Sequence, residues 1–244
     1  TALVSIMHAN NEVGTIQPLR EISDVAHKAG AAVHTDSVQS LGKIQVNIGE
    51  LGVDVLTVSA HKIYGPKGIG ALYIKRGTKI QPLIEGGGQE QNRRAGTENV
   101  PLAAGFAKAM ALTKESMDRG DPDRCKQLKE RLRERLTREF PGLMINGHPT
   151  LTLPTILSIS FDSSATKVDG EALIMGMDLE GVAVTSGSAC ASGTLEPSHV
   201  LLAMGRDVDT ARATIRFSVG RETTEEEVDY AVDALHRVVT KRER

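Results

Sequence analysis

Two side chains that could do chemistry follow short apolar runs of the sequence. Lys62 comes shortly after the apolar run 53–58, and Asp36 comes directly after the run 31–35. A lysine at the carboxyl end of a buried strand lies where open α/β sheets bind ligands. Desolvation there favours the neutral amine that forms Schiff bases. Taken alone, Lys62 is more simply a surface lysine that begins a loop.

The carboxylate of Asp36 could pair with a pyridinium nitrogen and keep it protonated, so that the ring withdraws electrons. Asp36 could equally be the N-cap of a helix, a position that aspartate fills well. The two residues together say more than either alone, because adjacent parallel strands of this length would bring Lys62 and Asp36 into one crevice.

The chain has two cysteines, and they lie in different surroundings. Cys190 lies in the small-residue stretch 186–193, where we expect a thiol to be exposed and mobile, although it could also be an ordinary loop residue. Cys125 lies on the apolar stripe of a predicted helix and is expected in the core. No CxxC or His-Cys pattern indicates a zinc site or a disulfide framework, which favours a reducing compartment. A disulfide between the two cysteines stays open.

Apolar runs of strand length alternate with amphipathic stretches, which predicts an α/β fold with a mainly parallel sheet. Pro18 suits the first position of a helix that ends at Gly30. The polar, glycine-rich stretch 86–99 is expected to be a loop. In this half we expect strands at 2–7, 31–35, 53–59 and 68–75, and helices at 18–30 and 101–117.

The pattern of predicted strands and helices changes after Pro141. Thr224 and Glu227 form a capping box that predicts the start of the last helix. This half is expected to be a small α+β domain with helices at 122–140 and 169–179 and strands at 155–161, 182–184 and 215–219. We therefore predict a large domain over 1–121, incomplete at its N-terminus, and a small C-terminal domain over 122–244.

Composition excludes several classes of protein. Hydrophobic residues make up 40% and charged residues 25% of the 244 residues, and the formal net charge is −2. No basic block indicates nucleic-acid binding, and no apolar run approaches the roughly 18 residues of a membrane span. We expect a soluble, cytoplasmic protein. Thr1 is not an initiator Met and begins a strand, so we expect a missing front portion, which could hide a mitochondrial or plastid targeting segment.

Six segments in order closely resemble the cysteine desulfurases of the NifS/IscS-like branch. These are pyridoxal-phosphate (PLP) enzymes of fold type I, in the class V aminotransferase family. The resemblance covers almost the whole chain, and each motif is modest alone. The segments are HANNEVG (8–14), HTDSVQS (34–40), SAHKIYGPKG (59–68), RAGT (94–97), SGSAC (186–190) and IRFS (215–218).

The resemblance implies a role for each matching residue toward the cofactor. Lys62 would hold PLP as a Schiff base, and Asp36 would bond the pyridine nitrogen. Gln39 would bond the phenolic oxygen, and Ser59 and His61 the phosphate. His61 would also act in catalysis together with Lys62.

The resemblance also implies partners. Thr97 would reach the phosphate of the partner subunit's cofactor, which implies a homodimer. Asn11 and Arg216 would hold the substrate carboxylate, a task for which the planar fork of arginine is suited. Cys190 would accept the sulfur, and no metal site is implied. The family normally carries a further N-terminal portion with an aromatic residue that stacks on PLP.

The implied reaction converts L-cysteine to L-alanine and leaves a persulfide on Cys190. Iron–sulfur scaffold proteins or other acceptors would then take the sulfur. Two enzyme alternatives of the same fold type are a selenocysteine lyase and an aminotransferase, although the latter has no use for Cys190. From another class, the chain could be a non-catalytic sulfur-transfer scaffold or dimer partner.

Overall fold

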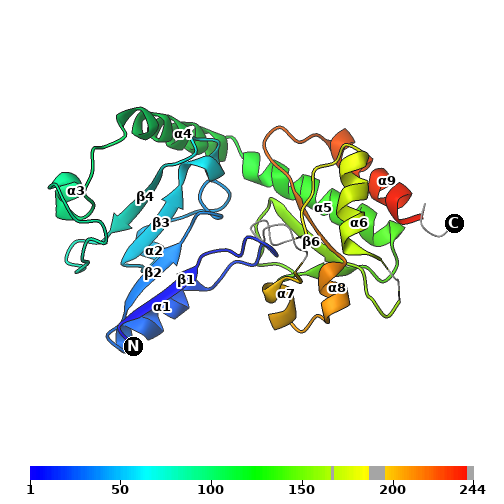
Figure 1. The fold of residues 1–244 in the computed structure, drawn as a ribbon, viewed down its shortest axis with the longest axis horizontal. Coiled ribbons are helices and arrows are strands. Elements are labelled where there is room, and N and C mark those ends of the chain that lie inside the picture. The colour runs from blue at the N-terminus through cyan, green and yellow to red at the C-terminus, as the bar shows by residue number, and fades with distance from the viewer. Residues whose placement is uncertain (166–167, 187–195, 241–244) are drawn as a thin grey trace. The chain divides into compact units, whose positions relative to one another are not determined.

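A computed structural model describes residues 1–165, 168–186 and 196–240. The chain divides into two compact units, which Figure 1 shows. The first contains Thr1–His8 and Gln17–Arg119, and the second contains Ala9–Ile16 and Gly120–Arg244. The loop 9–16, which is predicted to be part of the first domain, belongs instead to the second unit.

The first unit is built on a four-stranded sheet in the order β1-β2-β3-β4 (Figure 1). The strands are β1 (Leu3–Met7), β2 (Ala32–Asp36), β3 (Val55–Ser59) and β4 (Gly70–Ile74). Neighbours among the first three strands pair in parallel. The predicted α/β fold with a mainly parallel sheet is therefore confirmed.

The last strand of this sheet, β4, runs antiparallel to β3. Residues 60–69 connect the two strands and include only the short 3-10 helix η1 (Ala60–Ile63). A parallel connection needs a crossover of about a dozen residues or more. The short connection therefore forces the chain to return alongside β3.

Helix α1 (Leu19–Lys28) begins one residue after Pro18 and buries Leu19 and Ala26. Gly30 follows its end with φ of +77°, a conformation that glycine adopts without strain. A short helix, α2 (Ile48–Leu51), begins at the N-cap Asn47. The core beside these helices consists of Ala26, Ala31, Val33, Val53 and Leu56.

Helix α4 (Val100–Asp118) begins at Asn99, whose side chain accepts a hydrogen bond from the backbone of Leu102. Its buried residues Phe106 and Ala109 pack against Ala60 and Ile63 of η1. The predicted loop 86–99 contains one short turn, α3 (Gln89–Asn92), in which Glu90 and Gln91 adopt positive φ. Helix α4 therefore supports the turn that carries Lys62.

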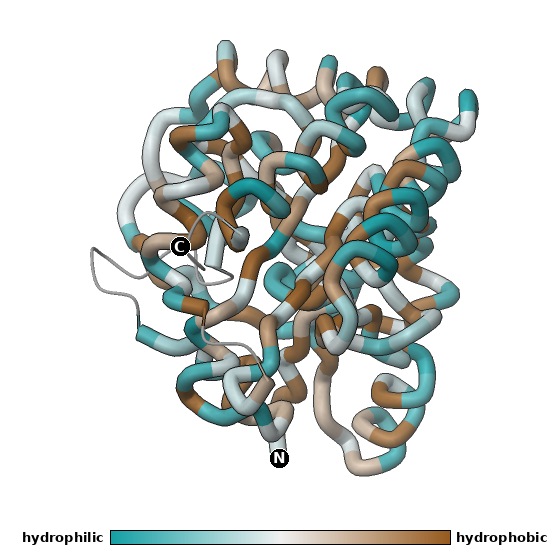
Figure 2. Tube along the Cα trace, turned by 90° about the vertical axis from the view of Figure 1, so that its right-hand side faces the viewer, coloured by the Kyte–Doolittle hydropathy of each residue, from teal (hydrophilic) through white to brown (hydrophobic). Residues whose placement is uncertain are grey.

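The second unit contains an antiparallel sheet in the order β5-β6-β7. Residues of α5, α6 and α9 form one hydrophobic core with it. In Figure 2 the helices show hydrophobic residues interspersed with hydrophilic ones, as amphipathic helices require. The strands are β5 (Met144–Asn146), β6 (Ile156–Ser160) and β7 (Thr214–Ser218); the helices are α5 (Asp121–Glu139), α6 (Gly170–Leu179), α7 (His199–Ala203), α8 (Val208–Arg212) and α9 (Glu225–Thr240).

Two predictions for this unit are confirmed. Thr224 and Glu227 form the capping box at the start of α9, with each backbone N–H bonded to the other side chain at 2.9 and 3.2 Å. Cys125 is a free thiol in α5 and is only 5% exposed, as expected for a core residue.

The predicted strand at 182–184 is wrong. These residues form no ladder, and only the next residue, Thr185, makes an isolated bridge to Arg216 of β7. Three apolar residues are too few to define a strand without knowledge of the partner strand. The sequence pattern also does not predict several short elements, because none of them is long enough to show a hydrophobic period. These elements are η1, α2, α7, α8 and β5.

Among the described residues, no helix is both long enough and apolar enough to span a membrane.

Candidate functional site

Asp36 and Lys62 lie at the carboxyl ends of two neighbouring strands of the first sheet. Asp36 is the last residue of β2, and it lies opposite Thr57 of β3 in a parallel register. Strand β3 ends two residues later at Ser59, and η1 then carries Lys62. The parallel pairing of β2 and β3 places the end of each strand at the same edge of the sheet. This is the edge at which open α/β sheets bind ligands.

In the turn that carries Lys62, the backbone lies so close to its neighbours that a side chain at Gly65 would not fit. Tyr64 ends η1 in the left-handed conformation, with φ of +63°. A Cβ atom on Gly65 would lie 2.9 Å from the carbonyl oxygen of Ala60 and 3.0 Å from Cβ of Ala109. The glycine is therefore required for the chain to fold back over the start of η1.

Ser59 and His61 are joined directly. The Ser59 hydroxyl and Nδ1 of His61 lie 2.8 Å apart. This bond leaves Nε2 of His61 available to a ligand. A hydroxyl and an imidazole are both suitable hydrogen-bond partners for a phosphate oxygen.

The side chain of Lys62 is exposed, contrary to the expectation that burial desolvates its amine. Asp36 is also exposed, and its Oδ1 accepts a hydrogen bond from the backbone of Val38 at 2.8 Å. This local bond is the one expected of an aspartate that begins a turn. It uses one carboxyl oxygen of Asp36, which leaves the other for a further donor.

Two other predicted cofactor residues lie in the first unit. The Gln39 side chain accepts a hydrogen bond from Nζ of Lys43 at 3.0 Å, so its amide NH2 group remains for a ligand. Thr97 is exposed and follows Gly96, which has φ of +110°. The structure thus places Thr97 on the surface of the loop before α4.

His8, directly after β1, and His34, on β2, differ in their hydrogen bonds. His34 bonds Ser5 through Nδ1 and Thr57 through Nε2, both at 2.8 Å, so both of its ring nitrogens are satisfied. His8 is only 3% exposed, and its Nδ1 has no hydrogen-bond partner among the residues that the structure describes. Burial lowers the pKa of His8, which favours the neutral ring. The ring of His34 is therefore fully bonded within the protein, whereas that of His8 is not bonded at Nδ1 by any described residue.

The other predicted site residues lie in the second unit. Arg216 is on β7 and is half-buried, and its Nη1 donates to the backbone carbonyl of Asn11 at 2.7 Å. Its Nε is buried and lacks a hydrogen-bond partner in the described ranges. Burial lowers the pKa of Arg216, and the charge of Glu12 acts in the opposite direction. A guanidinium stays protonated throughout the physiological range.

Glu12 was not singled out from the sequence, and only its place inside the segment 8–14 pointed to it. It is 4% exposed, and its carboxylate accepts a short hydrogen bond from the hydroxyl of Ser198. The side chain of Asn10 holds the loop by accepting from the backbone of Glu12 at 2.8 Å and of Val13 at 2.9 Å. A buried acid thus follows Asn11, the residue whose backbone carbonyl accepts from the half-buried Arg216.

Cys190, the predicted sulfur acceptor, lies outside the described residues. Among the described residues before and after it, Thr185 pairs with the backbone of Arg216, and Ser198 is the N-cap of α7. In the part of the chain that the structure describes, no group of three or more His, Cys, Asp or Glu side chains could hold a metal ion.

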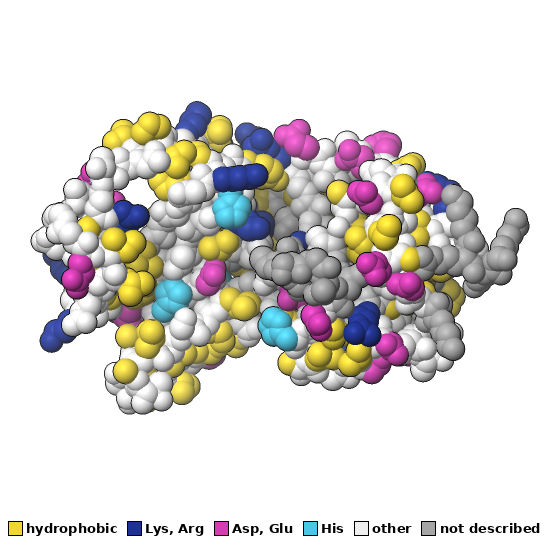
Figure 3. Space-filling view, viewed as in Figure 1, with side chains coloured by type: hydrophobic (Ala, Val, Ile, Leu, Met, Phe, Trp, Pro, Cys, Tyr) yellow, Lys and Arg dark blue, Asp and Glu magenta, His cyan; other side chains and the backbone are white. Residues whose placement is uncertain are grey.

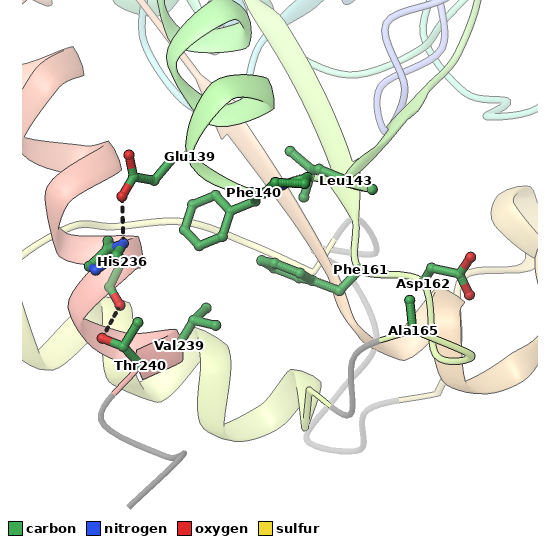
Figure 4. Close-up of a pocket in the computed structure, with 11 residues that line it drawn as sticks. Glu139, Phe140, Leu143, Phe161, Asp162, Ala165, His236, Val239 and Thr240 are labelled. Atoms are coloured by element: carbon green, nitrogen blue, oxygen red, sulfur yellow. Dashed lines mark hydrogen bonds and ion pairs between the residues drawn. The ribbon is translucent and has the colours of Figure 1, made fainter.

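Two cavities of the second unit lie apart from the predicted site residues. The first, of about 200 Å³, has Phe140 and Phe161 in its wall, 5.6 Å apart in an edge-to-face arrangement (Figure 4). An ion pair of 2.6 Å between Glu139 and His236 borders it. The second, of about 560 Å³, lies between the start of α9 and residues 181–183. Neither contains a residue predicted to bind cofactor or substrate.

The first unit exposes several large apolar side chains, and hydrophobic atoms are visible on this face of it in Figure 3. Single exposed apolar residues are ordinary on protein surfaces. Those exposed by at least half are Leu3, Val25, Tyr64, Leu72, Leu83, Ile84 and Val100.

The sequence and the fold are similar to those of known proteins. The cysteine desulfurase IscS of Dictyoglomus turgidum is 47% identical over 241 residues, which are 99% of this chain and 60% of that protein. The enzyme of the same name from Clostridium botulinum is 41% identical over 244 residues, with the same coverage of 99% and 60%. The chain therefore spans about 60% of the length of these curated relatives.

Solved structures give the same picture. A NifS-like protein from Rickettsia africae is 36% identical, with a TM-score of 0.87 over 97% of this chain and 61% of that one. A second NifS-like protein is 38% identical, with a TM-score of 0.86 over 99% of this chain and 62% of that one. The family model of the class-V aminotransferases matches residues 1–231. The chain therefore belongs to the aminotransferase class-V family.

Proposed function

We propose that this chain is part of a PLP-dependent cysteine desulfurase. The observation that supports this most directly is the arrangement at the edge of the first sheet. There the Ser59–His61 pair precedes Lys62, and Asp36 ends the neighbouring parallel strand. The similarity to proteins named cysteine desulfurase, at 41–47% identity, supports the same reaction.

The donor groups of the first unit match the chemistry of PLP. The Lys62 amine would hold its aldehyde carbon, and the Asp36 carboxylate would hold its ring nitrogen. Ser59 and His61 would bind its phosphate, and the free amide group of Gln39 would bind its phenolic oxygen. When bound, PLP supplies a ring that withdraws electrons from the substrate Cα.

The residues of the second unit would bind the substrate. Arg216 would pair with the carboxylate of L-cysteine, because its planar group offers two parallel N–H donors. Asn11 would assist, since its backbone already anchors Nη1 of Arg216. Lys62 Nζ would take the proton from Cα of the substrate and return one to the product.

The sulfur step would use Cys190. Its thiolate would attack Sγ of L-cysteine, so that an S–S bond forms and the C–S bond of the substrate breaks. The thiol of Cys190 becomes a persulfide and the substrate carbon skeleton leaves as L-alanine, which balances the atoms. An iron–sulfur scaffold or another acceptor protein would then remove the outer sulfur. We further propose a homodimer in which Thr97 reaches the cofactor phosphate of the partner subunit.

The proposal can be tested by measuring the colour and the sulfide release of the full-length protein. We expect a yellow preparation that releases sulfide from L-cysteine in the presence of a reductant. Lys62→Ala should lose both the colour and the sulfide release, since the amine holds the cofactor and moves the proton. A colourless wild-type protein that releases no sulfide would contradict the proposal and favour a non-catalytic scaffold.

Cys190→Ser separates a desulfurase from an aminotransferase of the same family. A desulfurase should keep its colour and lose sulfur transfer, because the acceptor thiol is gone. An aminotransferase should keep its amino-group transfer to a keto acid after the same substitution. Comparison of L-selenocysteine with L-cysteine as substrate separates the lyase alternative.

A further inference from the structure

Asn10 shapes the turn that contains Asn11, a residue that we assign to the substrate carboxylate. The Oδ1 atom of Asn10 accepts hydrogen bonds from the backbone of Glu12 at 2.8 Å and of Val13 at 2.9 Å. Asn10, Glu12 and Val13 are buried, with exposed fractions of 8%, 4% and 4%. An asparagine that caps a helix or begins a turn forms these bonds, to the backbone two and three residues later. Without this side chain, the backbone N–H groups of two buried residues would lose an acceptor.

The backbone of Asn10 closes the same turn. Its carbonyl accepts a hydrogen bond from Gly14 at 3.1 Å, and its N–H donates to the carbonyl of Thr15 at 2.9 Å. Gly14 adopts φ of +73°, and its own carbonyl accepts from the backbone of Leu153 at 2.8 Å. The turn is therefore held by Asn10 at its start and by Gly14 at its end. Because Asn11 lies between them, the turn sets the direction of its carbonyl group.

The guanidinium of Arg216 is oriented by this carbonyl. Its Nη1 donates to the carbonyl of Asn11 at 2.7 Å. Its Nε is buried and has no hydrogen-bond partner within the described residues. A guanidinium pairs with a carboxylate through two parallel N–H donors, which requires a defined orientation of its plane. The bond to Asn11 therefore helps to decide where the remaining donors of Arg216 point.

We propose that Asn10 is a positioning residue for the substrate carboxylate, because its side chain holds the turn and the turn holds both Asn11 and the guanidinium of Arg216. The effect is one of geometry and not of charge, since the guanidinium stays protonated whether or not the turn is intact. In a loosened turn, Asn11 and Arg216 would have to become ordered when the substrate binds, and this ordering opposes binding. This inference deepens the proposed function and rests on it.

The test compares Asn10→Ala with Asn10→Ser in the full-length holoenzyme. The two variants differ by one hydroxyl, which in serine can accept from the backbone as the Asn10 side chain does. The ligands are L-alanine, which carries the carboxylate, and L-alaninamide, which lacks its charge. Binding of each is measured from the absorbance change of the bound cofactor. The loss of one cap is small beside the stability of a folded protein, so both variants should remain folded.

We expect Asn10→Ala to bind L-alanine about tenfold more weakly than the wild type. L-alaninamide should lose at most about twofold, because hydrogen bonds to a charged acceptor are roughly twice as strong as those to a neutral one. Asn10→Ser should bind L-alanine within about threefold of the wild type, since serine caps nearly as well as asparagine.

A second variant, Gly14→Ala, disturbs the turn from its other end. Alanine is strained at φ of +73°, and its Cβ would lie 2.9 Å from Oγ1 of Thr152. This variant should also weaken L-alanine more than L-alaninamide. Asn47→Ala is the matched control, because Asn47 also accepts from the backbone two and three residues later, from Gly49 at 3.0 Å and Glu50 at 3.3 Å. It should bind both ligands as the wild type does.

Three results would overturn the inference while leaving the proposed function in place. The first is wild-type affinity for L-alanine in both Asn10→Ala and Gly14→Ala. The second is an equal loss of both ligands, which would indicate a general structural role for Asn10. The third is an equal loss in Asn10→Ala and Asn10→Ser, because the cap would then not be the cause. A wild-type protein whose absorbance responds to neither ligand would overturn the proposed function itself, and this inference with it.

Discussion

The hydroxyl of Ser59 and Nδ1 of His61 lie 2.8 Å apart, immediately before Lys62 in the chain. The bond joins the last residue of β3 to the turn η1 and fixes the direction of the imidazole. Helix α4 supports the same turn through Phe106 and Ala109, which pack on Ala60 and Ile63. The segment that carries the lysine is therefore held by contacts within the protein itself.

Ser59→Ala tests this arrangement. The substitution removes a proposed phosphate ligand and also the bond that orients His61. We expect PLP affinity to fall by about tenfold or more, because hydrogen bonds to charged groups contribute roughly 1.5–3 kcal/mol each. The measurement is a titration of the full-length apoprotein with PLP, followed by absorbance.

The control is Ser5→Ala, which breaks a serine–histidine bond of equal length in the same sheet, between Ser5 and His34. Its PLP affinity should remain within the error of the wild-type value. Equal losses in both variants would show that the sheet, and not the phosphate contact, accounts for the effect.

The two cysteines should behave differently toward alkylation. Burial raises the pKa of Cys125, which disfavours the reactive thiolate. We expect iodoacetamide to modify Cys190 in the native protein and Cys125 only after unfolding, with the sites identified by peptide mass spectrometry. Cys125→Ser should keep sulfide release, whereas Cys190→Ser should lose it. Rapid native labelling of Cys125 would contradict its position in the core.

Gly170→Ala should destabilise the second unit. A Cβ atom there would lie 1.9 Å from the backbone carbonyl oxygen of Arg212, and backbone cannot move aside cheaply. Overpacking of this kind costs about 1–3 kcal/mol, which urea unfolding can measure. Gly49→Ala is the matched control, because the nearest atom there, Asn47 Oδ1, is 3.4 Å away. A variant at Gly170 as stable as the one at Gly49 would contradict the tight contact.

The sequence alone allowed the prediction of much of the first unit. The apolar runs before Asp36 and Lys62 are long enough to identify strands β2 and β3. The parallel pairing of β1 with β2 follows from the predicted helix 18–30 between them. Hydrophobic periodicity likewise identified α5 and the core position of Cys125. These features are local or repeat with a regular period, so they leave a clear pattern.

Other features depend on contacts between residues far apart in the sequence, and no local pattern reveals them. The exposure of Lys62 depends on what covers the sheet edge, which the residues around it do not specify. The bond between Glu12 and Ser198 joins a loop near the start of the chain to a helix near its end. Similarly, the predicted strand 182–184 is absent, and Thr185 makes only an isolated bridge to Arg216, because pairing is decided by the partner strand.

Two arginines of α5, Arg131 and Arg135, pair with one acid of α9, Asp229. The free energy of unfolding should therefore depend on pH. Hydrogen bonding to Arg131, and also to Arg135, lowers the pKa of Asp229 from 3.8 to about 2. Because the folded-state pKa lies below the ordinary value, this contribution is complete above about pH 4 and is lost as the pH falls through 2. Between about pH 5 and 2, the melting temperature of the wild type should fall more steeply than that of Asp229→Asn. Salt at about 1 M shortens the screening length to roughly 3 Å and should reduce the difference between the two slopes. Identical slopes at low salt would show that the two helices gain nothing from this charge.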